Sequence, residues 1–257
     1  MPLPKAPTTR GERLDIKAAS RNKAKLPASR RRKSATAQAE ANPALGVRAY
    51  RTTRRDPEVL EHQLQALAKA EAATDAKVWV MAPMISTADE AEAFTDKARS
   101  YGLKTAGMMI EVPSAALMAD KLFEHADFAS IGTNDLTQYV MAADRLLSSL
   151  ADLSTGWQPA VLRLIKAACD GASPHGRPVG VCGEAAADPA LAVVLVGLGV
   201  ASLSMTARAL PDVDAVLKSV DLADCQRLAG LATSARTADD ARGAVRAELP
   251  ILEELGL

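Results

Sequence analysis

The stretch TAGMMIEVPSAALMADKLFEHADFASIGTNDL, residues 105–136, decides the fold class of this chain. It begins with an apolar strand (105–113), continues with a helical segment (114–126), and ends with a second apolar strand that runs into a polar turn (127–136). Strands that are apolar on both faces and joined by a helix are typical of a parallel sheet covered by helices. The stretch therefore predicts an α/β fold.

The same alternation extends in both directions along the chain. Further strands are expected at 78–85, 178–184 and 200–207, and further helices at 56–73, 86–102, 159–172 and 188–199. Asp-Pro pairs are expected to start two of these helices, at residues 56 and 188, and Thr87 with Glu90 predicts a capping box. Five strand–helix units fit either an open α/β sheet or most of a (β/α)8 barrel.

A net charge of zero hides two parts of opposite sign. Residues 1–39 contain 11 Lys or Arg and two acidic residues, so that 20 basic and 29 acidic residues remain in 40–257. The first part has few large apolar side chains and cannot bury enough surface to offset its ordering entropy. We expect a disordered basic head over 1–39 and the folded domain over 40–257. The run RRRK at 30–33 is compatible with nucleic-acid binding, but no aromatic residue accompanies it, and we predict a solvated tail and no nucleic-acid partner.

The three cysteines, Cys169, Cys182 and Cys225, form neither a disulfide framework nor a metal-binding spacing. A reducing, cytoplasmic setting is the simpler expectation. The longest apolar run, ALAVVLVGLGV, is shorter than the roughly 18–20 residues that span a bilayer, and we predict no membrane span.

Chemically active side chains follow the predicted strands where each strand ends. Glu111 follows one strand, Asn134 and Asp135 follow the next, and Cys182 ends the one after. The carboxyl ends of parallel strands lie at one edge of a sheet, and carboxylate and amide oxygens suit Mg²⁺. Each residue also has a plainer interpretation: Glu111 as a solvated strand end, Asn134-Asp135 as turn chemistry, and Cys182 as a small buried hydrophobe. Arg145 and Arg48 are positioned to add guanidinium groups, and Ser204 and Thr206 close the last strand.

Several of these segments carry a family resemblance. GMMIEVPSAALMAD, DFASIGTNDLTQYVMAADR, PAVLRLIKAA, VGVCGEAAADP and the upstream ANPALGVRAYR resemble the phosphoenolpyruvate-binding barrel of Enzyme I of the bacterial sugar phosphotransferase system. Pyruvate phosphate dikinase and phosphoenolpyruvate synthase share part of the pattern, and a fragment of such an enzyme is the alternative. The resemblance implies an incomplete (β/α)8 TIM-type barrel, over residues 40–257, in a phosphoenolpyruvate–protein phosphotransferase.

The resemblance also implies roles for individual residues. Glu111 and Asp135 would bind Mg²⁺, Asn134 with Asp135 would contact the phosphate, and Arg48 and Arg145 would hold the phosphate and carboxylate. Cys182 would donate the proton that converts the pyruvate enolate to pyruvate. A neutral thiol can deliver that proton, and arginine keeps its charge at any working pH.

The sequence departs from the family at its N-terminal side. The first two barrel strands are absent, and RLDIKAASRNKAKLP (13–27) keeps only traces of the third. The family's phosphorylated-histidine half is also absent, a short deletion lies near Gln158-Pro159, and none of His62, His125 and His175 lies in a phosphoacceptor motif. We therefore expect a phosphohistidine domain or carrier protein to act in trans, and a homodimer or a heterodimer with an intact paralogue is conceivable. An inactive module that only binds or oligomerises is the alternative.

Overall fold

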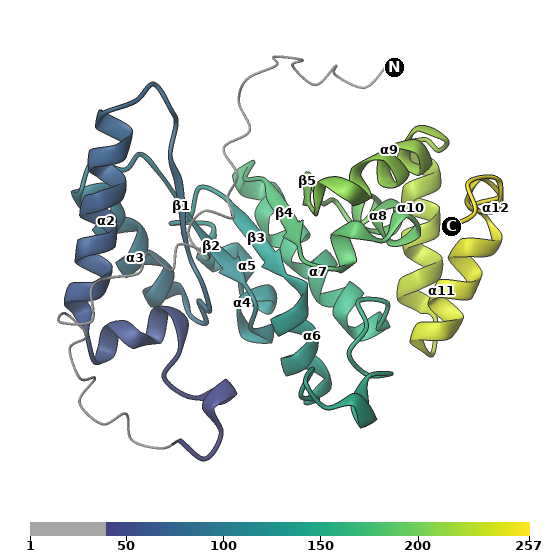
Figure 1. Cartoon of the computed structure of the whole chain (residues 1–257), viewed down its shortest axis with the longest axis horizontal. Helices are drawn as coiled ribbons and strands as arrows, with labels where there is room; N and C mark the ends of the chain where they lie inside the picture. The colour runs from purple at the N-terminus through teal and green to yellow at the C-terminus, as the bar shows by residue number, and fades with distance from the viewer. Residues whose placement is uncertain (1–39) are drawn as a thin grey trace.

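A computed structural model describes residues 40–257, which form one parallel sheet with helices packed against it (Figure 1). The expectation of a disordered head concerns residues 1–39, which lie outside this range. The strands are β1 (Trp79–Ala82), β2 (Thr105–Ile110), β3 (Ala129–Gly132), β4 (Val179–Cys182) and β5 (Ser202–Ser204). Each lies within a segment that the sequence predicts to be a strand, so those five predictions are confirmed.

The sheet has the strand order β1-β2-β3-β4-β5, and every neighbouring pair is parallel. Consecutive strands are therefore neighbours throughout, without the reversal of order that defines a doubly wound sheet. Within residues 40–257 the sheet is open, with β1 and β5 at its two edges.

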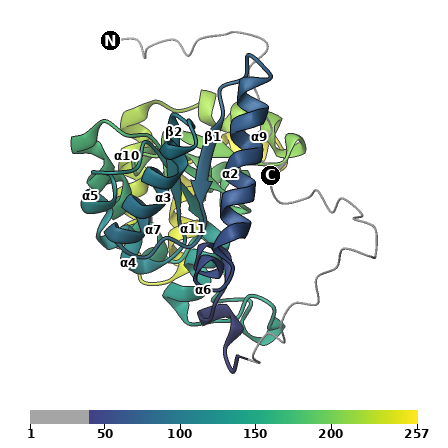
Figure 2. The same ribbon diagram turned by 90° about the vertical axis from the view of Figure 1, so that its left-hand side faces the viewer.

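The helices connect the strands and continue beyond the last one. They are α2 (Pro57–Ala72), α3 (Ala88–Ser100), α4 (Pro113–Leu117), α5 (Ala119–Leu122), α6 (Thr133–Met141), α7 (Pro159–Ala172), α8 (Pro189–Gly197), α9 (Leu210–Lys218), α10 (Leu222–Ser234), α11 (Ala238–Ala247) and α12 (Ile251–Glu254). Short 3-10 helices are η2 (Pro43–Leu45), η3 (Ala49–Arg54), η4 (Ser148–Leu150), η5 (Ser173–His175), η6 (Ala185–Ala187) and η7 (Ala207–Ala209). The chain runs from α2 and α3 at one side of the molecule, through the strands, to α9–α12 at the other (Figure 1). Figure 2 shows the molecule from the side that carries α2 and α3.

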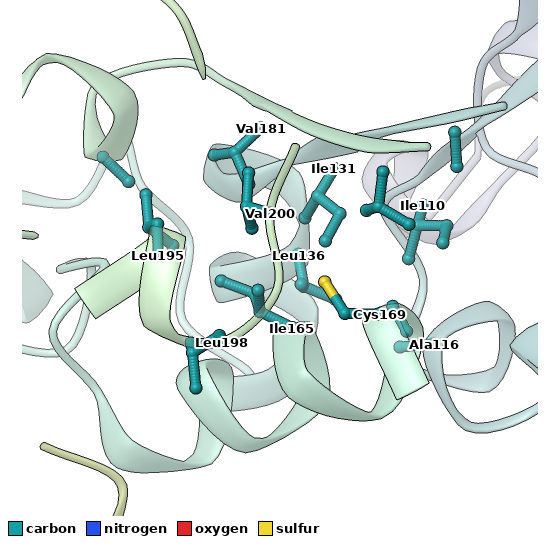
Figure 3. Close-up of a cluster of buried hydrophobic side chains, with 14 of the residues drawn as sticks. Ile110, Ala116, Ile131, Leu136, Ile165, Cys169, Val181, Leu195, Leu198 and Val200 are labelled. Atoms are coloured by element: carbon teal, nitrogen blue, oxygen red, sulfur yellow. The ribbon is translucent and has the colours of Figure 1, made fainter. Parts of the chain in front are cut away.

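The core lies between one face of the sheet and the helices. Ile110, Ile131 and Val181 point from three neighbouring strands towards Ile165 of α7 and Leu195 of α8 (Figure 3). All five side chains are at most 1% exposed. The burial of these branched and aliphatic side chains is the main force that holds the sheet and helices together.

The opposite face of the sheet is much less covered. Trp79 on this face is 52% exposed, and Met109, Ser130 and Cys182 are only partly buried. Phe128 is shielded by the indole of Trp79, with ring centroids 4.9 Å apart. The sheet thus has one apolar face sealed by helices and a second face, lined partly by small and polar residues, that is open within residues 40–257.

Two local predictions were wrong in part. Asn134 and Asp135 do not form a turn but lie in the first turn of α6. The single helix expected over 114–126 is divided into α4 and α5 at Met118. Just after this break α5 lies close against α7, since a Cβ on Gly171 would lie 2.7 Å from the Asp120 nitrogen.

Of the three predicted helix caps, one is confirmed, one is absent and one forms only in part. Asp188 accepts hydrogen bonds from the Ala190 and Leu191 N–H groups and caps α8, whereas Asp56 makes no side-chain capping bond to α2. Thr87 caps α3 by accepting from the Glu90 N–H, but the Glu90 carboxylate accepts from the Ser86 N–H instead of closing the box on Thr87.

Candidate functional site

The strand ends that the sequence singles out do meet at one edge of the sheet. Gly132 pairs with Cys182, and Cys182 pairs with Ser204, so these three strand ends lie at one level. Glu111 follows β2 one residue after the pair of Ile110 with Ile131 and joins the same level. A Cβ on Gly132 would lie 2.7 Å from Glu111 Oε1, so the Glu111 side chain lies directly over this glycine.

Glu111 is a buried carboxylate, 6% exposed, that is held by the backbone. The N–H of Met84, in the loop after β1, donates to Glu111 Oε2 at 2.9 Å. Burial raises the pKa of Glu111, and the neighbouring charge of Asp135 adds to this rise, whereas the Met84 hydrogen bond and the charges of Arg48 and Arg145 oppose it. Two negative charges therefore lie close enough to interact, which favours a cation between them.

Asp135 supplies the second carboxylate of the site from the first turn of α6. Arg48 Nη2 lies 3.3 Å from Asp135 Oδ1, within ion-pair distance. The alignment is too poor for a hydrogen bond, so Oδ1 is a buried oxygen without a hydrogen-bond partner among the described residues. A buried acceptor left in this way is costly unless something else satisfies it.

These two carboxylates fit a hard divalent cation. Across residues 40–257, no group of three or more His, Cys, Asp and Glu side chains gathers as a ready-made metal cage. Mg²⁺ typically takes one or two protein carboxylates and fills its other positions with water and substrate oxygens. A buried Glu beside an Asp with an unsatisfied oxygen meets that requirement.

Cys182 lies at the end of β4 on the open face of the sheet. Its Sγ is 3.5 Å from the Ile131 carbonyl oxygen, and burial raises the pKa of the thiol while contact with Ser130 lowers it and the charge of Glu111 raises it further. The thiol therefore stays protonated at neutral pH. In this state it can donate a proton, and it is not an activated nucleophile.

The turn after Cys182 brings it next to α6. Gly183 has a φ of 100°, a conformation that side chains other than glycine rarely adopt, and a Cβ there would lie 3.0 Å from Thr133 Oγ1. Thr133 Oγ1 in turn donates to the Cys182 carbonyl oxygen at 3.0 Å. The abrupt break after the strand therefore makes room for the start of α6, with Asn134 beside it.

The two arginines are placed differently. Arg48 is in direct contact with Asp135, whereas the Arg145 side chain is exposed and makes no ion pair within residues 40–257. Arg145 is fixed through its backbone N–H, which donates to Gln138 Oε1 at 3.3 Å. Its charge is near enough to lower the pKa of Glu111, so it borders the site from a loop. Ser204 and Thr206, at the end of the last strand, are both exposed.

Sequence reasoning missed two residues that contact the site. Met84 holds Glu111 through its backbone N–H, which no side-chain pattern reveals. The Tyr139 hydroxyl accepts a hydrogen bond from Arg48 Nη1 at 3.1 Å. Its spacing from Asp135, four residues along one helix, is a signal that could have found it.

Fold and site together define an α/β protein whose parallel strand ends carry two carboxylates, a protonated thiol and arginines. The chain belongs to the PEP-utilising enzymes, because a family model described as the PEP-binding domain matches residues 13–222. The match begins inside the segment expected to be a disordered head.

The chain is homologous to phosphoenolpyruvate-protein phosphotransferases. It is 49% identical over 211 residues to that protein of Streptomyces coelicolor, with 82% of this chain and 38% of the relative covered. It is 46% identical over 209 residues to a multiphosphoryl transfer protein of Xanthomonas campestris, with 79% of this chain and 25% of the relative covered. A phosphotransferase of Haloferax volcanii is 43% identical over 203 residues, with 74% of this chain and 36% of the relative covered. The chain therefore spans between a quarter and two fifths of these relatives.

The helices of residues 40–257 also lack the features of a membrane span. None of them has the length and the apolar character that a membrane span needs.

Proposed function

We propose that this chain binds phosphoenolpyruvate with Mg²⁺ and forms the substrate-binding part of an Enzyme I-type phosphoenolpyruvate–protein phosphotransferase. The observation that carries the proposal is the buried Oδ1 of Asp135, which has no hydrogen-bond partner among residues 40–257 and lies beside Arg48 and near the buried Glu111. A cation can satisfy these oxygens, and a phosphate can take the guanidinium that now faces Asp135. The similarity to phosphotransferases supports the same substrate.

The sheet order supports a matching proposal for the fold. Five consecutive parallel strands in sequential order are what five neighbouring strands of a (β/α)8 barrel look like. In that arrangement the face that carries Trp79 and Cys182 is the barrel interior, and further strands would pair with the edges of β1 and β5.

Each site residue has a role in the proposed reaction. Glu111 and Asp135 would hold Mg²⁺, which when bound offsets the negative charge that develops on the substrate oxygens. Asn134 and Arg48 would bind the phosphate, and Arg145 would reach the carboxylate from its loop. Arginine suits both anions because its planar fork offers paired N–H donors.

The chemical step transfers a phosphoryl group to a histidine of another domain or carrier protein. The bond between phosphorus and the enol oxygen breaks, a phosphorus–nitrogen bond forms, and the electron pair stays on the oxygen as pyruvate enolate. The Cys182 thiol then gives its proton to C3, and water reprotonates the thiolate. A thiol whose pKa is raised by burial is suited to this step because it still holds its proton at neutral pH. A cytoplasmic location, where such carriers would be met, stays a prediction.

Calorimetric titration of the folded chain with phosphoenolpyruvate, with and without Mg²⁺, tests the proposal. We expect Mg²⁺-dependent binding that Asp135→Asn weakens at least tenfold, since the amide cannot replace the charged ligand. Cys182→Ala should leave this binding unchanged while it abolishes proton exchange at C3 of pyruvate. The absence of binding by folded wild-type chain would refute the proposal, and loss of binding in Cys182→Ala would make Cys182 structural.

A second candidate is a module that acts only by association with another chain. The open edges of β1 and β5 and the exposed Trp79 favour it, because unpaired strand edges readily add further strands. Light scattering after size-exclusion chromatography tests this candidate. A monomer that melts cooperatively and binds substrate would contradict it.

A further inference from the structure

Helix α6 contacts Arg48 at two points, one helical turn apart. Arg48 Nη2 lies 3.3 Å from Asp135 Oδ1, and Arg48 Nη1 donates to the Tyr139 hydroxyl at 3.1 Å. Residues four apart on a helix lie on the same face, so Asp135 and Tyr139 contact the Arg48 guanidinium from the same side of α6.

The Tyr139 hydroxyl has a second partner on the same segment as Arg48. It donates to the carbonyl oxygen of Ala44 in η2, four residues before Arg48. One hydroxyl therefore ties down both the side chain of Arg48 and the backbone that leads to it. The backbone turns sharply beside this point, because Ala49 has a φ of 51°.

The two hydrogen bonds of the Tyr139 hydroxyl limit the freedom of the Arg48 side chain before any ligand binds. The long side chain of an arginine loses rotamer freedom when it is fixed, and this entropy loss weakens binding if it occurs only when the ligand binds. A side chain oriented in advance avoids this loss. Arg48 is 34% exposed, so packing alone does not fix it, and the Tyr139 hydroxyl supplies the missing constraint.

We propose that Tyr139 is a positioning residue that holds the Arg48 guanidinium against Asp135, oriented for the phosphate of the substrate. The inference rests on the proposed function, because it assumes that Arg48 binds that phosphate. Tyr139 itself need not touch the substrate. The hydroxyl is bonded to the Arg48 side chain and the Ala44 carbonyl oxygen and to no backbone group of α6, so its removal leaves the hydrogen bonds of the α6 backbone in place.

The test replaces Tyr139 by Phe, which removes one oxygen and keeps the ring. Tyr101→Phe is the matched control, since the Tyr101 hydroxyl makes no hydrogen bond within residues 40–257 and lies at the end of α3, before β2 begins. Both variants and the wild type are titrated with phosphoenolpyruvate and with oxalate, each with Mg²⁺. Oxalate resembles the enolate and its carboxylate but has no phosphate.

We expect Tyr139→Phe to raise the dissociation constant of phosphoenolpyruvate about tenfold, equivalent to about 1.4 kcal/mol, and that of oxalate less than twofold. Tyr101→Phe should change neither. A loss of folded protein would affect the dissociation constants of both ligands equally, so their ratio within one variant does not depend on it. Melting curves measure the stability of each variant separately. An equal loss for both ligands would reduce Tyr139 to a structural role, and an unchanged constant for phosphoenolpyruvate would overturn the inference.

Hydrogen–deuterium exchange separates this failure from failure of the proposed function. Tyr139→Phe should speed exchange of the Leu45, Gly46 and Arg48 amides, which are hydrogen bonded within this segment, even without a ligand. Wild type that binds no phosphoenolpyruvate would refute the proposed function, whatever the exchange. If Tyr139→Phe leaves the exchange of these amides unchanged, the Tyr139 hydroxyl does not hold the segment that leads to Arg48, and the inference is refuted.

Discussion

Gly132 offers a direct measure of how tightly Glu111 is placed. In Gly132→Ala the new Cβ would lie 2.7 Å from Oε1, 2.8 Å from Cγ and 3.1 Å from Cδ of Glu111, so most of that side chain must move. Overpacking of this kind costs about 1–3 kcal/mol. The backbone of Gly132 has a negative φ, −87°, so no backbone strain is added.

The loss is partly offset in the unfolded chain. Replacing Gly by Ala where the conformation permits gains about 0.4–1 kcal/mol through reduced unfolded-state entropy. A net loss of about 1–2 kcal/mol remains, which lowers the melting temperature of a chain this size by about 2–8 °C.

Gly180→Ala is the matched control, in the neighbouring strand and on the same face of the sheet. Its Cβ would meet the hydroxyl of exposed Ser202 at 2.6 Å, and that hydroxyl can rotate away. Only the entropy gain remains, so the melting temperature should rise by about 1–4 °C. The two substitutions should therefore shift stability in opposite directions.

Thermal unfolding followed by circular dichroism measures both shifts. Repeating Gly132→Ala in a Glu111→Ala background should remove most of its penalty, because the obstructing side chain is gone. A Gly132→Ala chain as stable as wild type, or a penalty that persists without Glu111, would refute this reasoning.

Two further predictions concern Cys182 and Asp188. Because burial raises the pKa of the Cys182 thiol, iodoacetamide should modify it slowly at pH 7 and increasingly fast above pH 8.5, about the ordinary pKa of a thiol. Mass spectrometry measures the rates. Modification at pH 7 as fast as in the unfolded chain would contradict the prediction. Asp188→Ala should cost about 2–3 kcal/mol, because it removes the cap of α8 and leaves the buried Trp157 Nε1, which donates to Asp188 at 2.9 Å, without an acceptor. Asp188→Asn keeps an acceptor and should lose less than half as much in a denaturant melt, so equal losses would count against this account.

Much of the fold could be predicted because its signals are local. The mainly apolar runs at 78–85 and 178–184 favour strands of a parallel sheet, and helices such as 159–172 place apolar side chains at every third or fourth residue. The first turn of α6 could not be recognised in the same way. Gly, Thr, Asn and Asp favour both turns and helix starts, and the buried Leu136 and Thr137 that settle the matter depend on tertiary packing.

The site was predictable to the extent that it follows from topology. Glu111, Asp135 and Cys182 lie together because parallel strands end at one edge. The hydrogen bond from Met84 to Glu111 is donated by a backbone N–H, and the contact of Tyr139 with Arg48 joins residues far apart in sequence. The first contact leaves no trace in the sequence pattern, and the second shows only in the four-residue spacing of Asp135 and Tyr139, so the partners of both become visible only in three dimensions.

The exposed indole on the open face gives the molecule a built-in optical probe. The chain has only two tryptophans: Trp79 is 52% exposed, and Trp157 is 4% exposed. Their environments are so different that water-exposed emission comes almost entirely from Trp79. Any polypeptide that covers this side of the sheet would shift that emission to shorter wavelength and leave the signal of Trp157 in place. Coverage of this face by another polypeptide can therefore be followed in real time, in unlabelled material.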